Sequence, residues 1–241
     1  MASKIIVDQV QKSGGTAFTL PTSDGADGTI MKTDGSGTLS FASAAAGFHQ
    51  MLVKTASDAT YSPDTGVTKL LVEVQGAGGG SGDTTGPTGT SSGAGGGYAR
   101  VQLTVTSADV MNVQIGSGGQ NATTTGGTGG ASSFASVSGT SFTTITANGG
   151  VGGGLTTQGA SGGSATGPAG GLYIPGGYGS MENQNSSGGH SWFGYGGMST
   201  GTGNPQTRDG VGYGSGASQA AAGTGIGADG ADGLVVIWEY K

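Results

Sequence analysis

Hydrophobic and polar residues alternate with a period of two in several stretches of this chain. Leu70, Val72 and Val74 lie on one face of 68–75 and Lys69, Glu73 and Gln75 on the other, and the same alternation returns in 99–105 and 111–115. Successive side chains of a β-strand point to opposite faces of the sheet, so this alternation predicts strands with one buried face. We therefore expect a small β-sheet built from these stretches.

The last apolar stretch, LVVIWEY at 234–240, is apolar on both faces except at Glu239. A strand of this kind is typical of the centre of a sheet. We expect it to close the sheet that begins at 67–75. Further strand patterns lie at 4–10, 48–55 and 142–147, and we expect almost no α-helix.

Between these stretches the chain consists largely of glycine. Glycine accounts for 57 of the 241 residues, where about 7% is usual. Polyproline II chains have three residues per turn and no internal hydrogen bonds, so glycine chains in this conformation can pack closely and bond laterally. We expect a polyglycine II helix bundle, beside a small β-sheet shoulder. A collagen triple helix is the weaker alternative, because a strict Gly-X-Y repeat is absent.

Turn residues divide the chain into three parts. Asp-Gly pairs separate brief apolar pieces in 1–47, which predicts a small strand-and-turn module. Residues 48–66 are expected to be a connecting segment that ends at the turn around Pro63 and Gly66. Residues 67–241 then form the glycine-rich domain.

The charge and the composition exclude several functions. The net charge is −6 with eight Lys and Arg residues, so a surface that binds nucleic acid is not expected. There is no cysteine, and His49 and His190 stand alone in the sequence, so no metal and no cofactor are expected. The start of the chain lacks the apolar core of a secretory signal, which predicts synthesis in a cytoplasm without export by that route.

Two carboxylates raise the alternative of a glycoside hydrolase. Glu182 and Asp209 bracket an aromatic stretch, and hydrolysis of a sugar uses such a pair. A catalytic acid needs a partly desolvated pocket, whereas this segment supplies mainly glycine. We therefore expect no catalytic residue and no enzyme activity.

The large apolar side chains of the glycine-rich domain gather in 172–213. Their neighbours are Gly, Asn and Ser, a composition typical of binding loops, in which rings give a large contact area at little entropy cost. We expect a receptor-binding surface made of Tyr173, Tyr178, His190, Trp192, Phe193, Tyr195, Arg208 and Tyr213. In the alternative interpretation, these rings cap the ends of the bundle or pack between subunits.

Several segments carry a resemblance to one class of protein. LLVEVQGAGGG (70–80), GAGGGYARVQLTV (93–105), ANGGVGGG (147–154) and GADGLVVIWEYK (230–241) resemble the glycine-rich domain of bacteriophage tail-fibre proteins, including the distal adhesins of T-even-type phages. TLPTSDGADGTIMKTDGSGTLSF (19–41) is similar to a module at the virion-proximal end of structural proteins from marine and cyanobacterial phages. The resemblance implies stacked polyglycine II helices whose tip loops bind a host receptor.

The expected function is therefore that of a tail-fibre or tail-tip receptor-binding protein in the virion. Its receptor would be a glycan or an outer-membrane protein of the host. Residues 1–47 would join other tail or virion proteins, and the expected assembly is a homotrimer. The alternative is a purely structural component, such as a fibre adaptor or a capsid decoration protein, in which the rings lie at subunit contacts.

Overall fold

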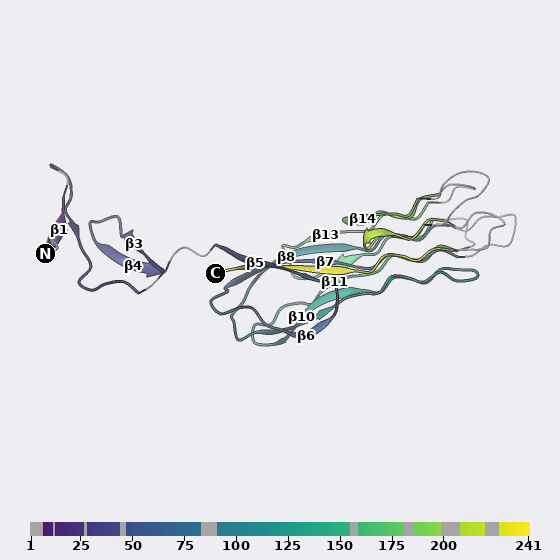
Figure 1. Ribbon diagram of the computed structural model, residues 1–241, viewed down its shortest axis with the longest axis horizontal. Helices are drawn as coiled ribbons and strands as arrows, with labels where there is room; N and C mark the ends of the chain where they lie inside the picture. Colours follow the sequence, from purple (N-terminus) through teal and green to yellow (C-terminus); the bar gives the residue numbers. More distant parts are fainter. Residues whose placement is uncertain are drawn as a thin grey trace, which may run out of the picture. The chain divides into compact units, whose positions relative to one another are not determined.

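The chain divides into two compact units, Met1–Gly47 and Phe48–Lys241. The computed structural model describes residues 7–11, 13–26, 28–43, 47–82, 91–154, 159–180, 186–198, 208–219 and 227–241 (Figure 1). Within these ranges there are sixteen β-strands and no helix, so no helical membrane span occurs among them. The predicted class, mainly β with almost no helix, is confirmed for these residues.

The first unit consists of two small antiparallel sheets. They pair β1 (Gln9–Val10) with β2 (Phe18–Thr19), and β3 (Thr29–Thr33) with β4 (Leu39–Ser43). Among the residues of this unit that the structure describes, only Gly37 is buried, while Ile30 and Met31 are exposed. These short strands therefore have almost no core of their own.

The second unit contains two five-stranded antiparallel sheets. The first sheet has the order β13 (Leu172–Ile174), β8 (Tyr98–Thr104), β7 (Lys69–Gln75), β16 (Leu234–Tyr240), β5 (Phe48–Lys54). The second has the order β12 (Ala165–Thr166), β11 (Ile145–Ala147), β10 (Ser132–Ser138), β9 (Val110–Gln114), β6 (Asp58–Tyr61). A separate ribbon pairs β14 (Phe193–Tyr195) with β15 (Val211–Tyr213).

The hydrophobic core lies between the two five-stranded sheets. Leu70, Val72 and Val74 are fully buried there, as the alternation in β7 predicts. The ring of Phe134 from the second sheet packs 6.0 Å from Tyr61 and 5.8 Å from Phe142, measured between ring centroids. Strands whose inward side chains interdigitate in this way form a small β-sandwich.

The C-terminal strand lies at the position that its apolar sequence predicts. β16 pairs with β7 on one side and with β5 on the other, so it is an interior strand of its sheet. The pairing with β5 corrects one expectation. Residues 48–66 are not a connecting segment, because they supply β5 and β6, one strand to each sheet. The partner of β5 lies about 190 positions later in the sequence, which is why the local pattern did not reveal it.

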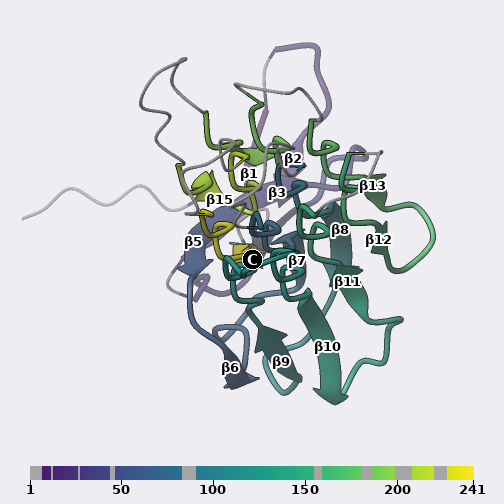
Figure 2. The ribbon, with the colours of Figure 1, turned by 90° about the vertical axis from the view of Figure 1, so that its right-hand side faces the viewer.

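The glycine-rich segments leave one end of the sandwich and run side by side, and Figure 2 views them end-on. Every residue of 76–82 and 91–97 is buried. In 76–81, the backbone N–H groups of successive residues donate to three different neighbouring segments, and the order of the segments repeats after three residues. Gly76 and Gly79 donate to 91–97, Ala77 and Gly80 to 126–130, and Gly78 and Ser81 to 228–231. The direction of hydrogen bonding therefore repeats every three residues.

Segment 91–97 follows the same rule. Its N–H groups donate in rotation to three segments: Ser91, Ala94 and Gly97 to 147–154, Ser92 and Gly95 to 175–180, and Gly93 and Gly96 to 214–219. The carbonyl groups of 76–81 accept hydrogen bonds from three further segments, 116–122, 147–154 and 214–219. Segments 76–81 and 91–97 therefore lie in the interior of the array, and backbone groups hold them in place.

The distance between segments leaves no room for side chains at many glycines. A Cβ atom built on Gly80 would lie 2.5 Å from the carbonyl oxygens of Gly119 and Gln120. One built on Gly129 would lie 2.5 Å from the carbonyl oxygen of Ala77. Glycine therefore permits the close approach on which the lateral hydrogen bonds depend.

Candidate functional site

The β14–β15 ribbon presents large side chains on one face only. Phe193 pairs with Tyr213, Gly194 with Gly212, and Tyr195 with Val211. Paired residues share a face and successive residues alternate, so the four large side chains lie on one face and the two glycines on the other. A Cβ atom built on Gly194 would lie 3.0 Å from the carbonyl oxygen of Tyr213 in the paired strand, so glycine allows the two strands to lie close together.

Three of the four large side chains of this ribbon are exposed to solvent, while Phe193 is half-buried. Tyr195 is 75% exposed, and Val211 and Tyr213 are exposed as well. His190 packs edge-on against Tyr195, with 5.8 Å between ring centroids. The backbone N–H of Gly196 donates to Nδ1 of His190 over 3.2 Å, which fixes the orientation of the imidazole ring. Tyr195 and His190 therefore form an ordered but solvent-facing pair.

Trp192 and Phe193 cover a buried tyrosine. The ring of Trp192 stacks on Tyr98 with 4.9 Å between centroids, and Phe193 meets Tyr98 edge-on at 5.8 Å. Tyr98 is buried and donates its hydroxyl to Oε1 of Glu73 over 2.6 Å. Burial, together with the adjacent Glu73 carboxylate, raises the pKa of Tyr98, so this hydroxyl keeps its proton. Trp192 nevertheless leaves 57% of its surface in solvent.

Gln75 fixes the position of Trp192 at the end of strand β7. The Gln75 side chain is fully buried, and its Nε2 donates to the carbonyl oxygens of Gly96 and Gly97, each over 3.0 Å. Its Oε1 accepts a hydrogen bond from the backbone N–H of Trp192 over 3.2 Å. The ribbon is therefore attached where the sandwich meets the glycine segments (Figure 1).

This position differs from the expected one. The resemblance implies that loops at the tip of the glycine segments bind the receptor, whereas Trp192 and Phe193 lie at the end next to the sandwich. The physical reason is the buried Tyr98 at the start of β8, which gives these two rings a surface to pack on. We name Trp192, Phe193, Tyr195, Val211, Tyr213 and His190 the aromatic ribbon.

The other three predicted site residues lie outside this ribbon. Tyr178 is 74% exposed on segment 175–180, whose Gly177 donates its N–H to the carbonyl of His190 over 2.8 Å. Tyr173 belongs to β13, packs against the core and donates its hydroxyl to the carbonyl of Pro168. Arg208 is exposed, and its backbone N–H donates to the hydroxyl oxygen of Ser218 over 2.7 Å. Tyr178 thus neighbours the ribbon through the backbone, while Tyr173 serves the fold.

The structure describes only Asp209 of the two carboxylates, Glu182 and Asp209, that a glycoside hydrolase would use. Glu182 lies outside the described residues. Asp209 is exposed, and its Oδ1 accepts a hydrogen bond from the backbone N–H of Asp229 over 2.9 Å. This contact holds two glycine-rich segments together.

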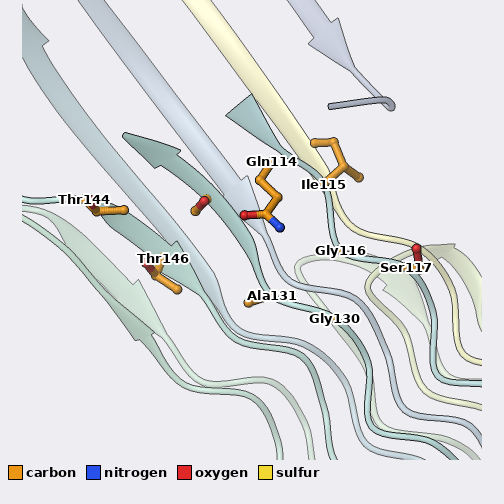
Figure 3. Close-up of a pocket in the computed structure, with 9 residues that line it drawn as sticks. Gln114, Ile115, Gly116, Ser117, Gly130, Ala131, Thr144 and Thr146 are labelled. Atoms are coloured by element: carbon orange, nitrogen blue, oxygen red, sulfur yellow. The ribbon is translucent and has the colours of Figure 1, made fainter. Parts of the chain in front are cut away.

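A polar groove lies on the second sheet (Figure 3). Its volume is about 540 Å³, and it lies where β9, β10 and β11 meet the glycine segments. It is lined by Gln114, Ile115, Gly116, Ser117, Gly130, Ala131, Ser133, Thr144 and Thr146. Hydroxyl and amide groups of this kind suit a neutral ligand, but the lining contains no ring on which a sugar could stack.

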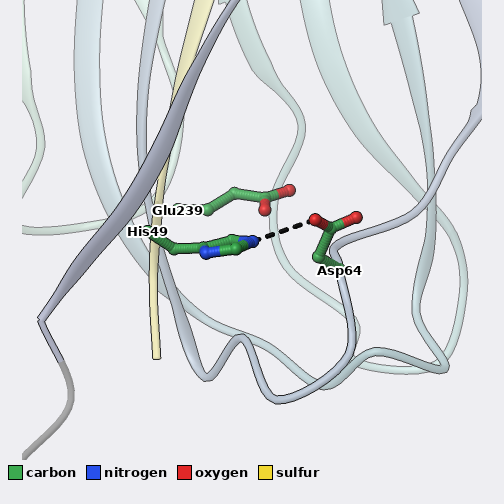
Figure 4. A group of neighbouring side chains, drawn as sticks. All are labelled: His49, Asp64 and Glu239. Atoms are coloured by element: carbon green, nitrogen blue, oxygen red, sulfur yellow. Dashed lines mark hydrogen bonds and ion pairs between the residues drawn. The ribbon is translucent and has the colours of Figure 1, made fainter.

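His49 does not stand alone in space. Its Nε2 lies 2.9 Å from Oδ2 of Asp64, and the carboxylate of Glu239 is adjacent (Figure 4). His49 comes from β5, Asp64 from the turn after β6, and Glu239 from β16. Sequence spacing gave no signal for this cluster, because 190 positions separate His49 from Glu239.

No protein-family model matches the chain, and no curated protein sequence matches it.

Proposed function

We propose that this chain is a bacteriophage tail-fibre or tail-tip protein that attaches the virion to the surface of the host cell. The exposed aromatic ribbon is the observation that carries this proposal. Large rings that stay in solvent on an ordered scaffold mark an interaction surface. Tyrosine and tryptophan are also the residues that most often dominate binding energy. The protein acts in this proposal as an adhesin of the virion, made in the host cytoplasm, and not as an enzyme.

The scaffold of the proposed adhesin is a polyglycine II bundle. Two observations support it: the direction of hydrogen bonding repeats every three residues in 76–81 and 91–97, and a Cβ atom on many glycines would meet neighbouring backbone. Three residues per turn is the period of this conformation. Such a bundle holds its shape without inward side chains, so the rings attached to it are available for recognition.

The receptor in this proposal is a host glycan or an outer-membrane protein. Trp192 and Tyr195 offer flat, exposed faces on which a sugar ring or an apolar side chain can stack. Val211 extends the surface with an aliphatic group, and His190 adds a polar edge. Tyr178, which lies on the adjacent segment, would widen the same surface.

The first unit is proposed to join other tail or virion proteins, in a homotrimeric fibre. The lack of a core in the described residues of this unit supports a role in assembly, because exposed side chains such as Ile30 and Met31 would gain from a partner.

The proposal is tested by competition for adsorption. Purified chain should bind host cells and reduce phage adsorption, and Tyr195→Ala should weaken this binding by about thirtyfold, the effect of losing about 2 kcal/mol. Val137→Ala is the matched control, because Val137 is an exposed apolar residue on β10, far along the chain from the ribbon. Equal binding by wild type and Tyr195→Ala would contradict the proposed site.

A purely structural role in the virion is the second candidate. It is favoured by the outward face of the first sheet, where Phe48, Met51 and Val53 of the edge strand β5 are exposed. An adaptor or decoration protein would cover these side chains in the particle. In that case the chain would enter virions and purified chain would leave phage adsorption unchanged.

A further inference from the structure

We propose that His49, Asp64 and Glu239 form a binding site for a divalent transition-metal ion of the zinc type. One potential ligand atom from each residue lies within 4.8 Å of the others. The site lies at the end of the second unit where the chain enters β5 and leaves β16, and it is independent of the proposed receptor-binding surface.

An irregularity in strand pairing brings the side chains of the cluster together. β5 pairs Gln50 with Glu239 and Phe48 with Tyr240, so the register shifts and His49 has no partner across the strands. Such β-bulges redirect side chains. As a result, His49 and Gln50, although consecutive in a strand, both contact Oδ2 of Asp64, at 2.9 and 3.1 Å.

Asp64 is held in place by a turn. Its carbonyl accepts a hydrogen bond from the backbone N–H of Val67 over 3.0 Å, and Gly66 inside this turn has a φ of 85°, a value that favours glycine. Asp64 is exposed and His49 is partly exposed. A metal ion therefore has access to the cluster from solvent.

Glu239 supplies a buried carboxylate to the cluster. None of its surface is exposed. Its oxygens accept hydrogen bonds from the hydroxyl of Tyr61 over 2.7 Å and from Nε2 of Gln50 over 2.9 Å. Both donors are neutral, and a buried carboxylate is favourable when a positive charge compensates it. A bound cation would supply that charge.

The neighbours of the cluster resemble an outer shell of a metal site. The hydroxyl of Tyr61 donates to Oε1 of Glu239 and so orients this carboxylate. Gln50 bridges the carboxylates of Asp64 and Glu239. Hydrogen bonds of this kind orient the ligands of metal sites and affect their affinity.

The set of donors indicates which ion fits. One imidazole nitrogen with two carboxylates suits zinc and related ions, whereas calcium requires six or more oxygen ligands. In a tetrahedral zinc site two ligand atoms lie about 3.4 Å apart. The His49–Asp64 separation of 2.9 Å therefore has to widen by a few tenths of an ångström, while a wider side of the cluster closes.

The test is a calorimetric titration of the untagged full chain with zinc sulfate, repeated with cobalt chloride while visible absorption is recorded. We expect one ion per chain and a higher melting temperature with zinc. With cobalt, we expect the visible absorption bands of a Co²⁺ ion that is bound in a site of low symmetry. His49→Ala should lower the affinity by about a hundredfold or more, since it removes the nitrogen ligand. Gln50→Ala should lower it by about tenfold.

His190→Ala is the matched control, because it removes the other histidine of the chain and should leave binding unchanged. Asp64→Asn changes an exposed side chain, so it should fold normally and bind zinc more weakly. Wild type that takes up no stoichiometric zinc would overturn the proposal. Unchanged affinity in both His49→Ala and Asp64→Asn would overturn it as well. Neither result bears on receptor binding, which the adsorption assay measures separately.

Discussion

The sandwich and the glycine segments belong to one unit but are stabilised in different ways. In the sandwich, side chains such as Leu70 and Phe134 are removed from water between two sheets. In the glycine segments, the buried groups are mostly peptide N–H and C=O groups, which bond to neighbours in several directions. A region can therefore be ordered with almost no apolar side chains when its backbone N–H and C=O groups find hydrogen-bond partners.

The two regions also differ in where they place large side chains. In the sandwich, a ring such as Phe134 is part of the fold. On the glycine segments, inward positions admit only hydrogen or a small group, so a large ring has to face outward, as Tyr178 and Tyr195 do. A scaffold made of backbone therefore exposes its rings as a consequence of its packing.

The largest effect on stability is expected in the sandwich core. Phe134→Ala removes a fully buried ring that packs against Tyr61 and Phe142, and should lower the free energy of unfolding by about 4 kcal/mol. Chemical denaturation measures this change. A loss below about 1 kcal/mol would mean that the sandwich does not rely on this core.

A smaller but still large effect is expected inside the glycine segments. A Cβ atom on Gly153 would meet the carbonyl of Ser91, so Gly153→Val should cost about 3 kcal/mol through overpacking. Val151→Ala in the same segment is the control and should change stability by about 0.5 kcal/mol or less, since Val151 is exposed. Equal stability of the two variants would contradict close backbone packing.

The smallest of the three effects is expected at the junction between the two regions. Gln75→Leu keeps the volume but removes the donor to the carbonyls of Gly76, Gly96 and Gly97, so three buried carbonyls lose a partner and stability should fall by about 2 kcal/mol. Gln102→Leu, on the exposed face of β8, should change little. Near-ultraviolet circular dichroism should also change in Gln75→Leu, because Trp192 loses the acceptor for its N–H. Identical spectra and stabilities would show that the junction does not fix Trp192.

The sequence predicted those parts of the fold that depend on local patterns. Alternation identified β7 and β8, and the apolar run at 234–240 identified an interior strand. The sequence did not reveal that β5 pairs with β16, because pairing between distant strands leaves no local trace. Glu239 illustrates the same limit. It is the single charged residue of its strand, and it is buried against Tyr61 instead of facing solvent.

The candidate site was predicted by composition but not by position. The sequence singled out the rings of 190–195, and the structure places four of them in one ribbon with Val211 and Tyr213. It could not indicate which end of the glycine segments holds them, since the chain runs up and down several times through similar sequence. The contact between Trp192 and Tyr98 decides this, and it joins residues 94 positions apart.

Amide hydrogen exchange measured by NMR tests whether the hydrogen bonds between the glycine segments, most of them from backbone to backbone, keep these segments ordered. The N–H groups of 76–81 and 91–97 all donate to neighbouring segments and are buried, so they should exchange as slowly as those of β7 and β8. Exchange of the glycine amides at the rate of an unstructured chain, while β7 and β8 stay protected, would contradict the account.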